Sequence, residues 1–200
     1  MARSPHGNLM MNGNTYPRDL LHRKQFFFGL EPGPDPNWPV YPMPDGYRLS
    51  AHPDLSVIQM ERNGLLVTLL GFLLDPFHPE DTDEQILARL CDAAPTLSQS
   101  LAFLESLSGR WILFLRLQDA WVVLNDAGGM RTLFYHIDPQ GRPWLASQPG
   151  LFAQKFGFSF SSEGLHYMSS PRYQEKIETW WPGESTAFAE VKHLLPNHLM

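Results

Sequence analysis

The order of apolar and polar positions predicts strands, then helices, then further strands along this chain. Residues 55–60 alternate apolar and polar side chains, as a strand with one buried face does. Asn63-Gly64 then marks a tight hairpin turn into residues 65–74, an almost unbroken apolar run that is typical of a strand buried on both faces. An aromatic run at residues 25–30 predicts one more strand near the start of the chain.

Two helices are predicted after the buried strand. Thr82 is a suitable N-cap, and Asp83 and Glu84 place negative charge in the first turn, where it complements the helix dipole. Apolar residues then recur at helical spacing until Pro95 interrupts the pattern. A second helix follows, and we expect it to end at Gly109.

Three aromatic-rich apolar runs within residues 107–152 predict consecutive strands of an antiparallel sheet. A turn with the sequence D-A-G-G-M-R separates the last two runs and contains Asp126, Gly128 and Arg131. We expect the acid and the base of this turn to pair across it. A short helix is predicted to follow the last run and to end near Gly157.

The remaining segments have less regular patterns. Residues 1–24 are polar without periodicity and are predicted to be a mobile N-terminal arm. Prolines recur through residues 31–46, and because proline lacks an amide donor, an extended loop is predicted there instead of a central strand. Periodicity is weak over 159–182, and an extended segment is expected at 188–199. Strands and helices without β-α-β alternation predict one α+β layered sandwich over residues 25–199.

Composition limits the possible partners and location. A chain of 200 residues that is 43% hydrophobic can bury a sizeable core. A net charge of −6, with no run of Lys and Arg, makes nucleic acid and anionic membranes poor partners. A single cysteine, Cys91, and the lack of an N-terminal basic and apolar leader predict a cytoplasmic protein. The eight histidines show no ligand-like spacing, so neither a metal nor a cofactor is predicted.

Several segments, in this order, resemble the glutamine amidotransferase domain of asparagine synthetases, which belongs to the class II, N-terminal-nucleophile type. The family's L-x-G-x-F-A-F, R-D-x-x-G-x-x-P-L-Y and A-S-E-x-K-A-L resemble the runs within 107–152. Its closing T-x-F/Y-x-x-I and L-x-P-G-x-x-L resemble residues 186–199. The resemblance covers about residues 50–199 and implies a four-layer αββα sandwich of antiparallel sheets. The S-G-G-x-D-S loop of the family's ATP-pyrophosphatase domain does not occur, so the synthetase domain is predicted to be absent.

The resemblance also identifies catalytic positions, and most of them are changed. The family's nucleophile is a cysteine exposed directly after the initiator methionine, whereas this chain has Ala2 there and its only thiol at Cys91, inside a predicted helix. The arginine of H-x-R-L-S-I, which grips the glutamine carboxylate, corresponds to Asp54, whose charge would repel that group. The oxyanion-binding Asn-Gly pair corresponds to Leu70-Gly71, which lacks one donor.

The family's S-D-C-E segment corresponds to residues 81–84, including Asp83 and Glu84, which also fit an ordinary helix start. We therefore expect no glutaminase activity. The chain resembles the inactive amidotransferase-like domains of synthetase relatives that do not use glutamine, such as β-lactam synthetase. The implied function is that of a pseudoenzyme domain acting with an ATP-dependent, amide-forming partner chain or domain.

Two alternatives stay open from the sequence. The old glutamine pocket, now lined by Asp54, Leu70, Gly71 and the acids at 81–84, can serve as a binding site for a small ligand, with an amine favoured over an amino acid. Alternatively, internal cleavage can expose Ser4 or Thr15 as the N-terminal nucleophile of an active hydrolase. The sequence makes no prediction of the oligomeric state.

Overall fold

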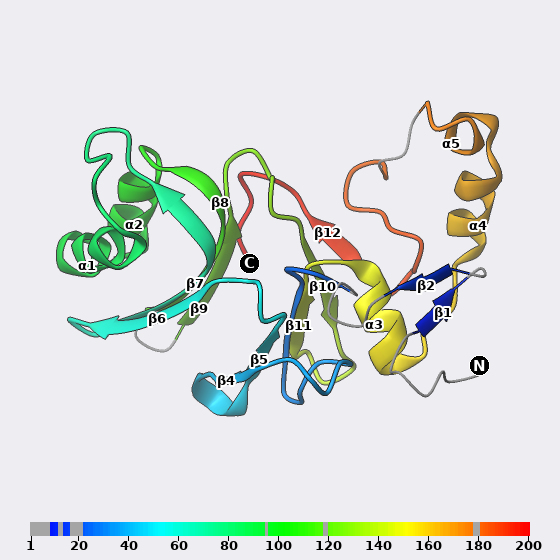
Figure 1. Ribbon diagram of the computed structural model, residues 1–200, viewed down its shortest axis with the longest axis horizontal. Helices are drawn as coiled ribbons and strands as arrows, with labels where there is room; N and C mark the ends of the chain where they lie inside the picture. Colours follow the sequence, from blue (N-terminus) through cyan, green and yellow to red (C-terminus); the bar gives the residue numbers. More distant parts are fainter. Residues whose placement is uncertain (1–8, 12–13, 17–21, 95, 118–119, 178–180) are drawn as a thin grey trace.

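The computed structural model describes residues 9–11, 14–16, 22–94, 96–117, 120–177 and 181–200. It is a mixed α+β structure built on two larger antiparallel sheets (Figure 1). The four-stranded sheet consists, in spatial order, of β6 (Val57–Arg62), β7 (Leu65–Leu74), β8 (Ser108–Leu117) and β9 (Ala120–Asn125). The six-stranded sheet consists, in spatial order, of β12 (Lys192–Leu194), β10 (Leu133–Ile137), β11 (Pro143–Ala146), β3 (Phe26–Gly29), β5 (Arg48–Ala51) and β4 (Val40–Pro42).

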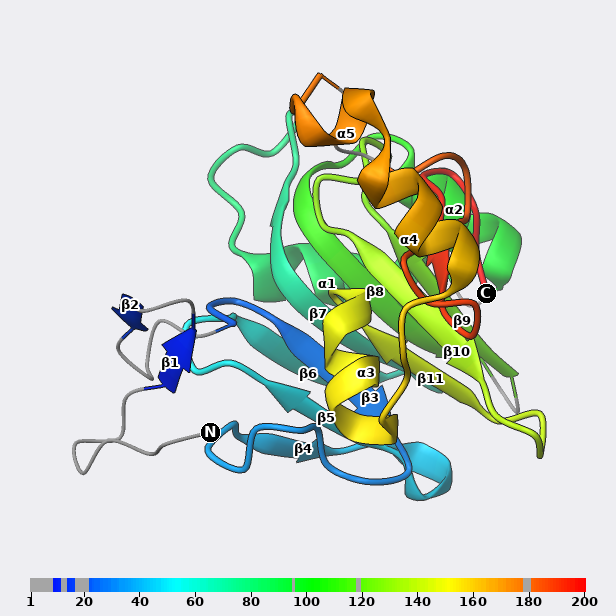
Figure 2. The ribbon, with the colours of Figure 1, turned by 90° about the vertical axis from the view of Figure 1, so that its right-hand side faces the viewer.

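Five α-helices accompany the sheets in the described ranges. They are α1 (Asp83–Ala93), α2 (Leu97–Leu104), α3 (Pro149–Phe156), α4 (Ser162–Ser169) and α5 (Pro171–Gln174). Figure 1 shows α1 and α2 at one side of the molecule and α4 and α5 at the other. Viewed after a quarter turn, α3 lies across the face of the six-stranded sheet (Figure 2).

Three apolar clusters define the packing of the layers. The first joins α1 and α2 to the outer face of the four-stranded sheet and includes Leu87 and Leu113. The second lies between the two sheets, where Phe26 of one sheet contacts Phe114 of the other with ring centroids 6.4 Å apart. The third joins the outer face of the six-stranded sheet to α3 through Phe152. The packing order is therefore helices, sheet, sheet, helix.

The middle of the chain folds largely as its pattern predicts. Asn63 and Gly64 both adopt positive φ, 53° and 79°, as a tight hairpin between β6 and β7 requires. Thr82 caps α1 and forms a capping box with Gln85, which confirms the predicted helix start. Gly157 ends α3 in the left-handed conformation, also as predicted.

The predicted role of Gly109 as a helix end is wrong. The helix α2 ends at Leu104, and Gly109 lies inside β8 with φ of 122°. A Cβ at this position would lie 2.3 Å from the carbonyl oxygen of Phe72 on the neighbouring strand. The glycine is needed for close strand approach, which its sequence context does not distinguish from a helix stop.

The turn at residues 126–131 does not join neighbouring strands of one sheet, as was expected. It carries the chain from β9 of the four-stranded sheet to β10 of the six-stranded sheet. The C-terminal segment also connects the sheets, because β12 pairs with β10 while Met200 exchanges two main-chain hydrogen bonds with Val123 of β9. The apolar runs predicted strands correctly but carried no information about which sheet each strand joins.

Several elements have too weak a pattern to be predicted. The loop expected at 31–46 contains the short strand β4, which lies at the sheet edge, and β5 follows it. Two short helices, α4 and α5, occupy part of the weakly periodic region 159–182. Of the predicted mobile arm, β1 (Leu9–Met11) and β2 (Asn14–Tyr16) form a hairpin, and most of the remaining arm lies outside the described residues.

Among the helices described, none is long and apolar enough to cross a membrane.

Candidate functional site

The segments that resemble the amidotransferase active site meet near the start of β3. Arg131 connects its own segment to that of Arg110, because its Nε donates to the carbonyl of Arg110 at 3.5 Å. Its Nη1 also reaches the residues just before β3, where it donates to the carbonyl of Lys24 at 3.3 Å. Its Nε also lies 3.0 Å from the position that a Cβ on Gly71 would occupy. The amide of Gly71 reaches a third segment by donating to the carbonyl of Ser56 at 3.0 Å.

Asp54 lies in the connection between β5 and β6 and is paired with a neighbouring base. Its Oδ2 is 2.6 Å from Nε of Arg23, and both side chains are about half exposed. The hydrogen bond from Arg23 lowers the pKa of Asp54 below its ordinary value. The negative charge that was expected to select an amine is therefore already compensated within the protein.

The Leu70-Gly71 pair cannot act as an oxyanion hole in this structure. Leu70 is fully buried between the two sheets and has no hydrogen-bonding side chain. The amide of Gly71, the second donor that the resemblance implies, is already bonded to Ser56. Both donors are thus unavailable to a substrate oxygen, whereas the sequence predicted the loss of only one.

Asp83 and Glu84 belong to the first turn of α1. The Oδ1 of Asp83 accepts the main-chain N–H of Leu73 at 2.7 Å, and burial raises the pKa of this carboxyl. Glu84 is exposed. Asp54 and Asp83 thus each have a different partner, Arg23 for the first and the N–H of Leu73 for the second.

Asp126 stabilises the turn through main-chain amides. Its carboxylate accepts the N–H groups of Met130 at 2.8 Å, of Arg131 at 2.9 Å and of Trp111 at 3.4 Å. The expected pairing of the acidic and basic side chains is not among the described ion pairs, because Asp126 binds the main-chain amide of Arg131 while the guanidinium group donates to carbonyl oxygens. Gly128 lies within this turn, and a Cβ added there would make only ordinary contacts with Met130 and Asp126.

Four basic residues lie in the segments that meet near the start of β3. We call them the basic cluster: Arg23, Lys24, Arg110 and Arg131. They come from the segment before β3, from β8 and from the turn after β9, so their sequence positions do not indicate that they meet. This group was missed from the sequence because no two of the three segments are adjacent in the chain.

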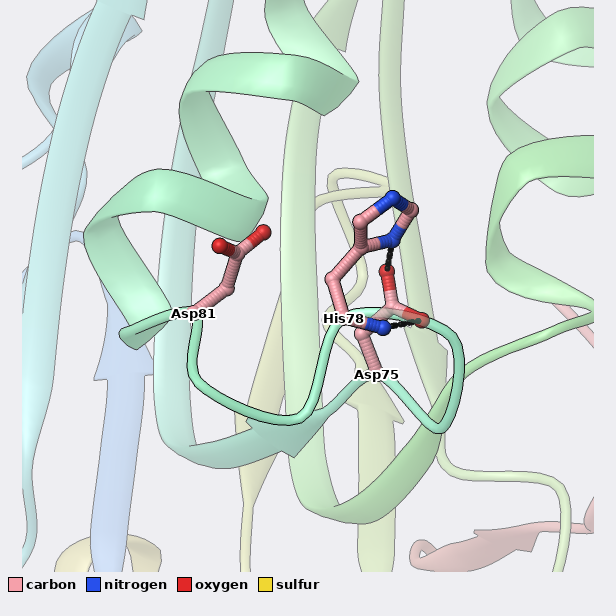
Figure 3. Close-up of side chains that lie close together, drawn as sticks. All are labelled: Asp75, His78 and Asp81. Carbon is pink, nitrogen blue, oxygen red and sulfur yellow. Dashed lines mark hydrogen bonds and ion pairs between the residues drawn. The ribbon is translucent and has the colours of Figure 1, made fainter.

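A second charged group lies in the loop between β7 and α1. Asp75, His78 and Asp81 place potential metal-ligand atoms within 4.8 Å of one another (Figure 3), although the sequence predicted no such grouping. However, Nη2 of Arg89 lies 2.5 Å from Oδ2 of Asp75 and 2.9 Å from Oδ2 of Asp81. A guanidinium group already provides the positive charge between the two carboxylates, so these residues do not fit a metal ion without displacing Arg89.

Replacing Arg89 with leucine is expected to lower the melting temperature at pH 7 by about 5–10 °C. The Asp75 side chain is only 4% exposed, and the hydrogen bond from Arg89 lowers its pKa well below the ordinary range. A lowered pKa stabilises the fold above the unfolded-state pKa of about 4, and this stabilisation is lost as the pH falls below it. Melting curves between pH 7 and pH 3 should show that the variant loses less stability on acidification than the original chain.

The matched control for this prediction is Arg62→Leu. Arg62 pairs with Asp92 at 2.6 Å, but both side chains are about half exposed. A change below about 2 °C is expected for it, because exposed ion pairs contribute little. Equal shifts for the two variants would show that the buried position of Asp75 does not matter.

The predicted nucleophile candidates occupy positions of other kinds. Cys91 is buried in α1 against the four-stranded sheet, and burial raises the pKa of its thiol. Thr15 pairs with Met10 inside the β1–β2 hairpin, and Ser4 lies outside the described residues. A buried thiol with a raised pKa is a poor nucleophile, so Cys91 is a packing residue.

Three cavities lie away from the residues of the predicted pocket. One of about 440 Å³ is bordered by the start of α4 and residues 184–192, and one of about 290 Å³ by α2, β8 and residues 197–199. A smaller apolar cavity of about 120 Å³ is lined by aromatic residues that include Phe28 and Trp121.

Neither a scan against protein-family models nor a search of curated proteins finds a match to this chain.

Proposed function

We propose that this chain is a non-catalytic, class II glutamine amidotransferase-like domain of the N-terminal-nucleophile fold type. In this proposal it acts with an ATP-dependent, asparagine-synthetase-type partner that forms an amide bond, on a separate chain or on a further domain. The observation that carries the proposal is the meeting of the segments that resemble the family's active site. Gly71 bonds to Ser56, and Arg131 bonds to the carbonyl of Arg110 and to that of Lys24 just before β3.

The helix, sheet, sheet, helix order supports the same assignment. The resemblance implies two stacked antiparallel sheets covered by helices on their outer faces. In this structure the aromatic side chains of β3 occupy both faces of the six-stranded sheet, and so they pack both between the sheets and against α3.

Three features argue that the domain does not hydrolyse glutamine. Asp54 replaces a cation by an anion, Leu70 lacks an amide side chain, and the amide of Gly71 is bonded within the protein. Each feature removes a separate requirement: carboxylate binding, and the first and second oxyanion donors. With all three changed, the residues at these family positions provide neither carboxylate binding nor an oxyanion hole for amide hydrolysis.

The amine-binding alternative has lost its main support, because Arg23 compensates Asp54. The processed-hydrolase alternative requires a chain that starts at Ser4 or Thr15. Measurement of the intact mass of the natural protein tests it directly, and a mass beginning at residue 1 or 2 excludes it. We retain binding of a small ligand, of a different charge, as the second candidate.

Two measurements test the proposed function. The purified chain, incubated with L-glutamine, is expected to release no more glutamate than a blank, while an active class II amidotransferase domain serves as the positive control. Affinity capture from the native cell is expected to recover a chain that carries an S-G-G-x-D-S loop. Enzyme-like glutamate release overturns the non-catalytic assignment. The partner assignment is overturned if the proteins that bind specifically never include a chain with this loop.

A further inference from the structure

The guanidinium group of Arg131 is a partly buried cation without an ion-pair partner in the described ranges. It donates only to the carbonyl oxygens of Lys24 and Arg110, at 3.3 and 3.5 Å. Burial lowers the pKa of Arg131, and the charge of Arg110 lowers it further, against an opposing effect of Asp126. A cation that has lost part of its hydration is unfavourable unless an anion compensates it.

The nearby acids form no ion pair with the guanidinium group of Arg131 among the described contacts. The carboxylate of Asp126 accepts three main-chain N–H groups, and Asp54 pairs with Arg23. Counted over the basic cluster and these two acids, 4 − 2 leaves a surplus of two positive charges on a chain whose net charge is −6. Lys24 and Arg110 are exposed, and neither makes an ion pair with a described residue.

We infer that the basic cluster binds a small oxyanion, a carboxylate or phosphate group, with Arg131 as the principal ligand and Arg110 and Lys24 as supporting charges. The Nη2 of Arg131 donates to no described residue, which leaves one arm of the planar guanidinium group for an incoming oxygen. Its hydrogen bonds to carbonyl oxygens are long, so Nη1 can also turn to the anion. Bidentate binding of this kind is the usual way in which arginine holds carboxylate and phosphate.

The inference reverses the charge of the ligand that the sequence suggested. Asp54 alone favours an amine, but its pairing with Arg23 removes that preference, and the uncompensated charges are positive. The inference does not rest on the amidotransferase assignment, since it needs only the geometry of the cluster. An anion site at this position is compatible with an inactive domain, because binding needs neither a nucleophile nor an oxyanion hole.

The test is isothermal titration calorimetry of the full chain with inorganic phosphate and, separately, with succinate, at an ionic strength held constant with sodium chloride. Binding of either probe is expected, and the preferred probe identifies the class of oxyanion. Arg131→Gln is expected to weaken binding by roughly tenfold or more, and Arg131→Lys by less, because it keeps the charge but not the planar fork. Arg110→Gln is expected to weaken it by roughly threefold.

The matched control is Arg62→Gln, which removes the same charge at the β6–β7 hairpin. Arg62 pairs with Leu65 at the start of β7, whereas Gly71, beside Arg131, lies toward the end of that strand. This control is expected to leave the affinity unchanged. Absence of binding by both probes, or equal weakening by Arg62→Gln and Arg131→Gln, overturns the inference. Circular dichroism checks that each variant is folded, and if Arg131→Gln does not fold, the exposed Arg110→Gln decides between a specific site and general attraction.

Discussion

Replacing Asp126 with alanine is expected to lower the free energy of unfolding by about 3 kcal/mol, because three main-chain amides lose one shared acceptor. The Asp126 side chain is 3% exposed, so water cannot easily replace it. Two of the amides, those of Met130 and Arg131, belong to the turn, and the third, that of Trp111, belongs to β8. Chemical denaturation followed by circular dichroism measures the loss.

The control variant is Asp126→Asn, which keeps the shape and one acceptor oxygen. It is expected to lose about half as much stability. The NH₂ group of asparagine cannot accept a hydrogen bond, so one main-chain N–H loses its acceptor while the remaining oxygen still serves the others. A loss below about 1 kcal/mol for alanine would show that packing, and not the carboxylate, determines the turn. Because Arg131 follows in the same turn, a destabilised turn should also weaken phosphate or succinate binding.

The sequence predicted the parts of this fold that depend on local pattern. The hairpin at Asn63-Gly64, the capping box at Thr82 and the left-handed Gly157 each follow from the side chains of one short segment. The prediction at Gly109 was wrong because a glycine required by a neighbouring strand has the same local signal as one that ends a helix. The strand β5 was missed because its four residues are too few to establish an alternation.

The candidate site was less predictable, since its chemistry depends on contacts between distant segments. The sequence identified Asp54 as an acid in place of an arginine, but not that Arg23, 31 positions earlier, compensates it. It likewise identified Arg131, but not that its guanidinium group donates to the carbonyl of Lys24, 107 positions earlier. The uncompensated charge near this site is therefore positive, whereas Asp54 taken alone suggested a negative site.

Replacing Gly71 with alanine is expected to lower the free energy of unfolding by more than about 4 kcal/mol or to prevent folding. Gly71 has φ of 104°, and a Cβ there would lie 2.0 Å from the carbonyl oxygen of Arg110. That carbonyl belongs to β8, which is paired with β7 over ten residues, so it cannot retreat without breaking the ladder. Denaturation of the variant, or its yield in soluble form, measures the effect.

Gly64→Ala is the matched control, because Gly64 also has positive φ, of 79°, but no atom lies within 4 Å of the added Cβ. Its cost is expected to be about 1 kcal/mol, from the backbone conformation alone. Equal losses would show that β8 yields and that the close approach at Gly71 is unimportant. A much larger loss at Gly71 means that strand packing by itself requires a glycine there. Because the amide of Gly71 is also bonded to Ser56, the glycine in this amidotransferase-like segment is then explained by packing and not by oxyanion binding.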